Sequence, residues 1–200
     1  MNTYSHILLG RILCSHMHTH YGIKLDRRSF VLGNVLPDYY PSFLLRPHFQ
    51  KNNARYIQKT LRQLVSCRGV SPADKRMSRL LGILCHFYAD TLCLAHNDDY
   101  TGTLADHYQY EKSLHSYFME HSRQIGAYRF IIPSVGVVKT SNLYRQFRHV
   151  HARYLLAQRC YASDLMYAMM ACVQSIAMIC EGAAFESLPI LQDEIIRLAV

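Results

Sequence analysis

The sequence predicts an all-α protein that forms one compact domain over residues 1–200. Apolar residues recur at intervals of three and four along most of the chain, which is the period of an α-helix. Half of the residues are apolar and only 18% are charged, which is typical of a chain that buries a core. No internal repeat, low-complexity tract or linker divides the chain. We therefore expect a single multi-helix domain of about seven helices.

The N-terminal elements follow from this period. Residues 4–21 carry apolar side chains at helical spacing and end at Gly22, which predicts a first helix. A short second element is expected to begin at Ser29, as its N-cap, and to stop before Pro37. Prolines at 37, 41 and 47 block helix continuation, so residues 37–48 are expected to be irregular. This loop would contain Asp38 and His48.

The remaining elements are also expected to be helical. Residues 50–67 are amphipathic, and Ser71 followed by Pro72 predicts the start of a long helix that ends near Leu94. Further helices are expected over residues 104–122, 141–159, 162–183 and 187–198. The segment 128–140 has β-branched residues, but its proline and glycine favour a loop or at most a short hairpin.

The formal net charge of +8 is unevenly distributed. Residues 46–79 contain nine Lys or Arg and one acid, and residues 121–163 contain seven basic residues and no acid. Acidic residues instead gather between positions 90 and 111. Basic flanks around an acidic pocket suit an anionic substrate held near bound cations, and a solvated basic surface explains the charge equally well.

Seven cysteines, an odd number without a C-x-x-C pair, lie mostly in apolar helical patterns and indicate reduced, buried thiols. The N-terminus lacks the basic region and apolar core of a signal peptide, so a cytoplasmic location is expected. The longest apolar run, residues 165–180, is shorter than the roughly 20 residues needed to cross a bilayer. It therefore predicts a buried helix, and no transmembrane segment is expected.

Two pairs of candidate metal ligands stand out, His86 with Asp90 and His107 with Glu111. Residues four apart share one face of a helix, so an imidazole nitrogen and a carboxylate oxygen can converge on one ion. For the first pair alone, a buried His–Asp hydrogen bond is an equally good explanation. His96 lies about 240° round the helix from Asp90 and can join the group only where that helix ends.

The ordered set of these residues resembles the zinc-dependent phospholipases C of bacteria, whose zinc-site architecture is shared with fungal single-strand-specific nucleases. The matching segments run in the same order from residue 4 to residue 111, and the spacing H-x3-D-x5-H is the strongest of them. They are SHILLGRIL with His6, LGNVLPDYY with Asp38, RPHF with His48, LGILCHFYADTLCLAHN with His86, Asp90 and His96, and HYQYE with His107 and Glu111. Residues 112–200 match this family only in being helical.

The resemblance implies up to three zinc ions in a cleft of an all-helical domain. One ion would be held by Asp38, His48, His86 and Asp90, and a second by His96, His107 and Glu111. Asp90 would bridge to a third ion, which His6 and the amino terminus would share. Because Asn2 is bulky, we expect Met1 to be retained, so that its amine is the terminal ligand.

The resemblance also implies a phosphodiesterase that attacks phosphorus with metal-activated water, with Asp38 as a general base. Aromatic faces at Tyr39, Tyr40 and Phe43 would cage the quaternary ammonium of a phospholipid headgroup. The same residues would also suit stacking on a nucleobase. Packing within the proline-rich loop explains Tyr40 at least as well.

Three functions remain open from the sequence. The leading hypothesis is a zinc-dependent phosphodiesterase that cleaves a phospholipid headgroup, with peripheral contact between its basic surface and the inner leaflet. The second is a nuclease that uses the same metals on single-stranded nucleic acid. The third is a metal-binding protein with little catalysis. Assays on a phosphorylcholine ester and on single-stranded DNA separate these hypotheses.

Overall fold

The computed structural model describes residues 1–39, 50–67, 69–133 and 138–181. Within these ranges the chain forms seven α-helices, one short 3₁₀-helix and no strand, which confirms the all-α prediction. The helices are α1 (Thr3–Tyr21), α2 (Arg27–Tyr39), α4 (Gln50–Ser66), α5 (Lys75–Thr91), η1 (Leu94–His96), α6 (Leu104–Ala127), α7 (Thr140–Leu156) and α8 (Tyr161–Glu181). The helix predicted over 187–198 lies outside the described residues.

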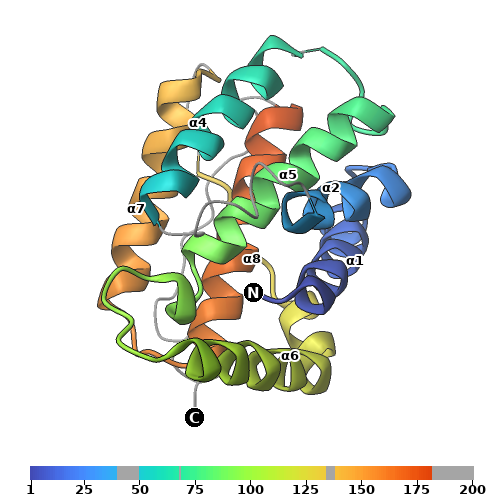
Figure 1. Ribbon diagram of the computed structural model, residues 1–200. Helices are drawn as coiled ribbons and strands as arrows, with labels where there is room; N and C mark the ends of the chain where they lie inside the picture. Colours follow the sequence, from blue (N-terminus) through green and yellow to red (C-terminus); the bar gives the residue numbers. More distant parts are fainter. Residues whose placement is uncertain (40–49, 68, 134–137, 182–200) are drawn as a thin grey trace.

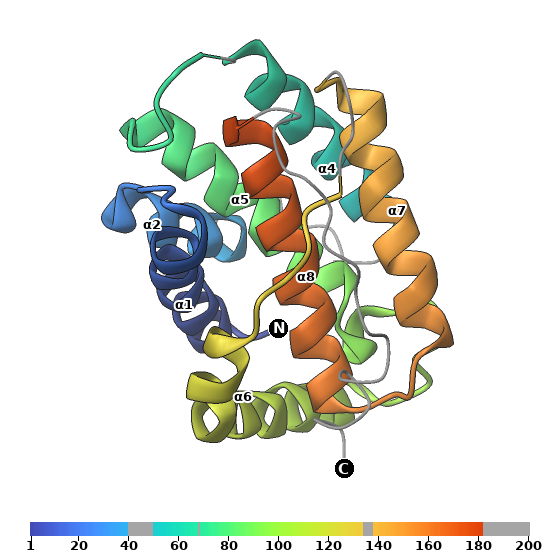
Figure 2. The same cartoon turned by 180° about the vertical axis from the view of Figure 1, so that it is seen from behind.

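Helices α5 and α8 form the centre of the molecule (Figures 1 and 2). Helix α5 packs against α2, α4 and α8, and α6 crosses one end of the bundle. The α5 side chains of Leu81, Leu84 and Tyr88 are fully buried. Helix α8 is long and apolar enough to cross a bilayer, but 89% of that stretch is buried inside the protein. It is therefore the core helix that the sequence predicted.

Helices α2 and α5 approach each other through two glycines. A Cβ atom at Gly33 would collide with the carbonyl oxygen of Arg79, and one at Gly82 would collide with that of Phe30. Only residues without a side chain allow the two backbones to come so close. This contact places the C-terminal end of α2, which carries Asp38, beside His86 on α5.

Local signals set the helix ends, but several lie at positions other than those predicted. The side chain of Asp26, not Ser29, accepts from the backbone at the start of α2, since its Oδ1 receives the Ser29 N–H at 2.9 Å. Asp74, not Ser71, caps α5 by accepting from Arg76 and Met77. An aspartate carboxylate is the stronger acceptor at both starts.

The predicted loop at Asp38 is also wrong, because α2 continues through Pro37 to Tyr39. Proline removes only one backbone hydrogen bond, and near a C-terminal end few further turns depend on it. Asp38 therefore lies in the last turn of a helix. Helix α6 also differs from its prediction, because it runs to Ala127, five residues beyond the predicted end. Between α6 and the start of α7 at Thr140, the described residues are irregular, as expected.

Candidate metal centre

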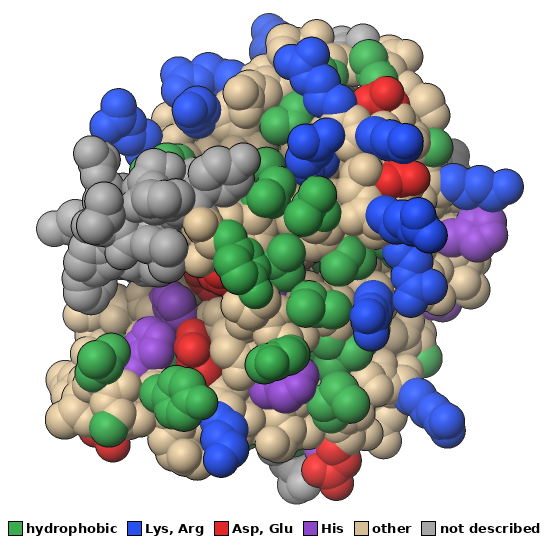
Figure 3. Space-filling view, turned by 45° about the vertical axis from the view of Figure 1, so that its right-hand side comes forward, with side chains coloured by type: hydrophobic (Ala, Val, Ile, Leu, Met, Phe, Trp, Pro, Cys, Tyr) green, Lys and Arg blue, Asp and Glu red, His purple; other side chains and the backbone are tan. Residues whose placement is uncertain are grey.

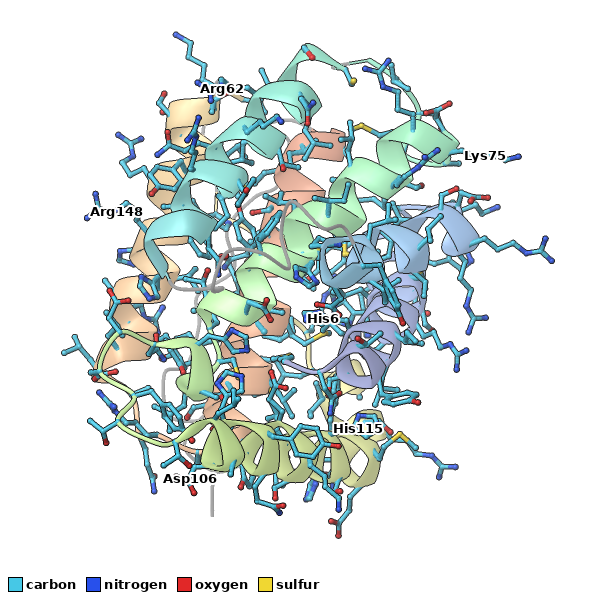
Figure 4. The ribbon with its side chains drawn as sticks, in the orientation of Figure 1. His6, Arg62, Lys75, Asp106, His115 and Arg148 are labelled. Carbon is cyan, nitrogen blue, oxygen red and sulfur yellow. The ribbon has the colours of Figure 1, made fainter. Side chains whose placement is uncertain are left out.

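Five segments meet at one end of α5 and bring the predicted ligands together. They are the start of α1, the end of α2, the second half of α5, η1 and the first half of α6. Figure 4 shows His6 between α1 and α5 in the middle of the molecule. The end of α5 at Thr91 followed by η1 turns His96 back toward Asp90, which is the helix end that the sequence analysis required.

Asp90 is the hub of the centre. Its carboxylate is almost completely buried, and its Oδ1 lies 2.7 Å from the Met1 amine and 3.1 Å from His6 Nε2. Its other oxygen, Oδ2, lies 3.3 Å from His86 Nε2. One carboxylate thus contacts an imidazole of its own helix together with an amine and an imidazole from the distant N-terminal segment.

The first of two candidate ligand groups consists of His6, Asp38 and His86, whose ligand atoms lie within 4.8 Å of one another. We call this the deep group, because both imidazoles are fully buried. The rings of His6 and His86 stack with their centroids 4.1 Å apart. The distance from His86 Nε2 to Asp38 Oδ1 is 3.8 Å.

Two neighbours orient the deep group. His86 Nδ1 donates to the carbonyl oxygen of Asn34 at 2.8 Å, and Thr3 Oγ1 donates to Asp38 Oδ2 at 2.8 Å. Since the Asn34 carbonyl can only accept, the proton of a neutral His86 ring resides on Nδ1. The lone pair of Nε2 then points toward the carboxylates of Asp38 and Asp90.

The second group, the rim group, consists of His96, His107 and Glu111. Glu111 Oε1 lies 2.9 Å from His96 Nε2 and 3.4 Å from His107 Nε2. The Met1 amine connects this group to the hub, because it lies 2.8 Å from His96 Nε2 and 3.1 Å from Glu111 Oε1. His107 is 29% exposed, so the rim group opens to solvent.

Charge and burial act against each other throughout the centre. Burial alone would lower the pKa of the Met1 amine, but the negative charges of Asp90 and Glu111 raise this pKa well above its ordinary value. Burial would likewise raise the pKa of Asp90, but the Met1 ammonium and the neighbouring imidazoles hold it well below its usual range. Burial would raise the pKa of Glu111 too, but the Met1 ammonium and the hydrogen bonds from His107 and His96 lower it. Asp90 and Glu111 are therefore both anionic.

The two stacked histidines respond in opposite ways. Burial and the neighbouring His86 lower the pKa of His6 to about 4. For His86, burial also lowers the pKa, but Asp90 and Asp38 outweigh it and the pKa rises. If both stacked rings were protonated, they would repel each other, so His6 and His86 do not both become imidazolium ions. Protons on these rings alone therefore do not neutralise the carboxylates of Asp38 and Asp90.

A shared cation fits this donor set. Imidazole nitrogens and carboxylate oxygens are zinc ligands, and ligands of a tetrahedral zinc ion at about 2.1 Å lie roughly 3.4 Å apart. The contacts among the candidate ligand atoms span 2.7 Å, from Met1 N to Asp90, to 3.8 Å, from His86 to Asp38. The hydrogen bond from His86 Nδ1 to a backbone carbonyl is the usual way to orient a metal-binding imidazole.

Comparison with known proteins decides the family. A family model described as zinc-dependent phospholipase C matches residues 5–161. The chain belongs to the zinc-dependent phospholipase C family. No curated protein and no solved structure matches the chain.

Membership in the zinc-dependent phospholipase C family confirms the resemblance seen in the sequence and extends it. The match includes α6 and α7 and reaches residue 161, whereas the sequence motifs ended at residue 111. The protein is therefore a phosphodiester hydrolase by family, with zinc as its metal and a phospholipid as its substrate class.

The structure brings most of the predicted ligands together. Met1, His6, Asp38, His86, Asp90, His96, His107 and Glu111 all lie in the centre, joined by the contacts given above. In the deep group, the ligand atom of His6 lies within 4.8 Å of those of Asp38 and His86, although the resemblance had assigned His6 to a different ion from these two residues. His48, Tyr40 and Phe43 lie outside the described residues. Tyr39 is 65% exposed next to Asp38.

The sequence analysis missed the residues that hold the ligands in place. Asn34 and Thr3 orient His86 and Asp38, and Asp164 braces the rim group from α8. The Asp164 carboxylate is fully buried and accepts from the Leu94 N–H at 3.0 Å and from Tyr110 and Tyr154 at 2.9 and 2.8 Å. Leu94 begins η1, which carries His96, and Tyr110 precedes Glu111.

Burial raises the pKa of Asp164 to about 6, and the hydrogen bonds from Leu94, Tyr154 and Tyr110 partly offset this rise. A sequence signal for the residue existed, since Asp164 is the one acid in an otherwise apolar segment from Tyr161 to Cys180. A buried carboxylate in such a helix needs partners.

Proposed function

We propose that the protein hydrolyses the phosphodiester bond of a phospholipid headgroup at a centre of up to three zinc ions. One observation carries the proposal. Seven side chains of the family's ligand types, with Asp90 and Glu111 among them, gather around the Met1 amine from five segments of the chain. Packing does not require such a concentration of imidazoles and carboxylates at one buried point.

The ligands divide among the ions as follows. Asp38, His86 and Asp90, together with His48, would hold one ion, and the rim group would hold the second. The Met1 amine, which contacts both Asp90 and Glu111, would join Asp90 and His6 on the third. An amine binds a metal only in its neutral form, so binding of this ion would release the proton that the amine carries in the metal-free protein.

Zinc supplies a Lewis acid that polarises a phosphoryl oxygen and makes water available as a nucleophile near neutral pH. The protein's own contribution is orientation. Thr3 fixes one oxygen of Asp38, and this carboxylate is 20% exposed, whereas that of Asp90 is 2% exposed. Asp38 can therefore reach a solvent molecule and substrate and serve as the general base, while Asp90 is restricted to binding.

For the substrate, the exposed ring of Tyr39 supports contact with a headgroup, because it follows Asp38 directly. The formal charge of +8 supports peripheral contact with an anionic membrane surface. No feature of the described residues favours single-stranded nucleic acid over a phospholipid.

The test combines metal counting with turnover. Elemental analysis of the purified protein should give up to three zinc ions per chain, and the loaded protein should hydrolyse a phosphorylcholine ester. The variant Asp90→Asn should lose more than about 100-fold of this activity together with bound metal. Asp98→Asn, which removes an equal charge from an exposed position eight residues away, should retain both.

Three outcomes contradict the proposal. Hydrolysis of single-stranded DNA but not of the ester would assign a nuclease. Stoichiometric zinc without turnover on either substrate would assign a metal-binding protein. An intact mass that shows Met1 removed would exclude its amine as a ligand.

A further inference from the structure

The exposed face shared by α1 and α2 is amphipathic along its length. On α1 the outward residues recur at helical spacing, and the same holds on α2. We call this surface the docking face, and it consists of Tyr4 and Arg11 on α1 and Arg28, Leu32 and Tyr39 on α2, all of which are exposed. Tyr4 is 71% exposed and Leu32 is 47% exposed, although both are large and apolar.

On both helices, the tyrosine of the docking face lies nearer the metal centre than the arginine does. They pack side by side near Gly10, where an added Cβ would lie 3.3 Å from the side chain of Val31. The start of α1 and the end of α2 both lie at the metal centre, so the two helices run in opposite directions. Tyr4 and Tyr39 therefore lie at the end nearest the centre, and Arg11 and Arg28 lie toward the far end.

The space-filling view agrees with this order. Figure 3 shows the side of the molecule on which α1 and α2 lie, with hydrophobic side chains gathered across its middle. Histidine and acidic side chains border them on the left, and most of the charged side chains to their right are Lys or Arg, with a few acidic ones among them. The apolar band thus connects the metal centre to a basic edge.

This order of groups suits a lipid surface. Tyrosine rings prefer the boundary between headgroups and acyl chains, and exposed leucines gain free energy when they enter it. Arginines at the edge attract anionic headgroups. Because the aromatic end borders the centre, a bilayer on this face would present headgroups to the metal ligands.

We propose that the docking face binds the surface of a phospholipid bilayer that contains anionic lipid, and that it does so with the metal centre turned toward the headgroups. The role of the docking face in presenting lipid to the metal centre rests on the proposed function, whereas the arrangement of its residues does not. A second copy of the chain is the competing occupant, and the experiment below distinguishes it.

The test measures sedimentation of the zinc-loaded protein with phosphatidylcholine vesicles, with and without phosphatidylglycerol. Arg11→Glu with Arg28→Glu should reduce partitioning to the anionic vesicles at least about tenfold, because two positive charges become negative and the net charge of the face falls by four units. Tyr4→Ser with Leu32→Ser should reduce partitioning to both kinds of vesicle. Hydrolysis of a water-soluble phosphorylcholine ester should stay unchanged in both variants.

A matched control lies on α7, where Leu155 and Leu156 are exposed and Arg148 points away from the protein (Figure 4). Arg145→Glu with Arg148→Glu, and Leu155→Ser with Leu156→Ser, should leave vesicle binding unchanged. Zinc content and circular dichroism identify any variant that fails to fold. If one docking-face variant fails to fold, the other one tests the inference.

Unchanged partitioning of both docking-face variants, or an equal loss in the α7 variants, would overturn the inference. A wild-type protein that elutes as a dimer and becomes monomeric in Tyr4→Ser with Leu32→Ser would assign the face to a second copy. Vesicle binding without hydrolysis of any ester would retain the docking face and reject the proposed function, whereas ester hydrolysis without vesicle binding would do the reverse.

Discussion

The deep and rim groups are built from the same ligand types but are held in different ways. The deep group gathers its members from three helices, α1, α2 and α5, and its imidazoles are fully buried. The rim group draws all its members from η1 and the start of α6, within residues 96–111, and remains open to solvent at His107. Tertiary packing thus fixes the deep group, whereas local chain geometry supplies most of the rim group.

This difference predicts unequal costs when a ligand is lost. Water can replace a ligand where solvent reaches the ion, but it cannot enter a packed site without a further cost. The deep group should therefore tolerate substitution less than the rim group.

The largest expected effect is the loss of a deep ligand. His86→Ala should reduce hydrolysis of a phosphorylcholine ester by more than about 100-fold and release bound zinc, because it removes a buried ligand that contacts the carboxylates of both Asp38 and Asp90. The loss of hydrolysis in His107→Ala should be about tenfold smaller than the loss in His86→Ala. Zinc titration against a chromophoric chelator and initial rates measure both variants, and equal losses would contradict the proposed difference between the groups.

Acidification of the metal-free protein should act through the deep group. The pKa of His6 is lowered to about 4, from an ordinary value of 6.5. The unfolded chain therefore takes up a proton at this residue before the folded chain does, so stability falls as the pH drops from about 6.5 to about 4. The full difference corresponds to about 3 kcal/mol.

Urea denaturation at a series of pH values measures this dependence. His6→Asn removes the titrating ring, and the decline in its free energy of unfolding between these pH values should be correspondingly smaller. A decline as steep as that of the wild type would assign the acid sensitivity to other groups.

The brace on the rim group should have an intermediate effect. Tyr110→Phe removes one hydrogen bond to Asp164 and should weaken the affinity for one zinc ion about tenfold, since groups that orient a metal site contribute 10- to 100-fold. Its matched control is Tyr88→Phe, which removes a buried phenol bonded to Ser175 of the same helix, α8. That variant should lose a similar amount of stability but no zinc affinity.

Thermal unfolding and zinc titration of the two tyrosine variants separate the alternatives. Loss of zinc affinity in both would show that Tyr110 supports the fold in general. Loss in neither would show that Asp164 does not position η1 and α6 for metal binding.

The smallest expected effect concerns the orientation of Asp38. Thr3→Val keeps the shape of the side chain but removes its hydrogen bond to Asp38 Oδ2, which is worth about 1 kcal/mol. The expected result is a roughly fivefold lower kcat with an unchanged zinc content. Thr3→Ser should restore the rate, and a zinc loss in Thr3→Val would instead assign Thr3 to metal binding.

The sequence by itself determined what depends on neighbours along the chain. Helical period predicted the all-α class, and the four-residue spacing placed His86 beside Asp90 and His107 beside Glu111. The sequence also indicated that the helix carrying Asp90 ends before His96, because only then can His96 reach Asp90. These features are decided within one or two turns of a helix, so the pattern of residues suffices to find them.

Only the tertiary structure decided how the pairs become one centre. The contacts of Asp90 with Met1 and His6 join residues 89 and 84 positions apart, and they depend on how α1 and α5 are placed. The close approach of α2 and α5 at Gly33 and Gly82 brings Asp38 to His86. Asn34, Thr3 and Asp164 act through hydrogen bonds to distant elements. No local pattern encodes such contacts, because they arise from the packing of whole helices.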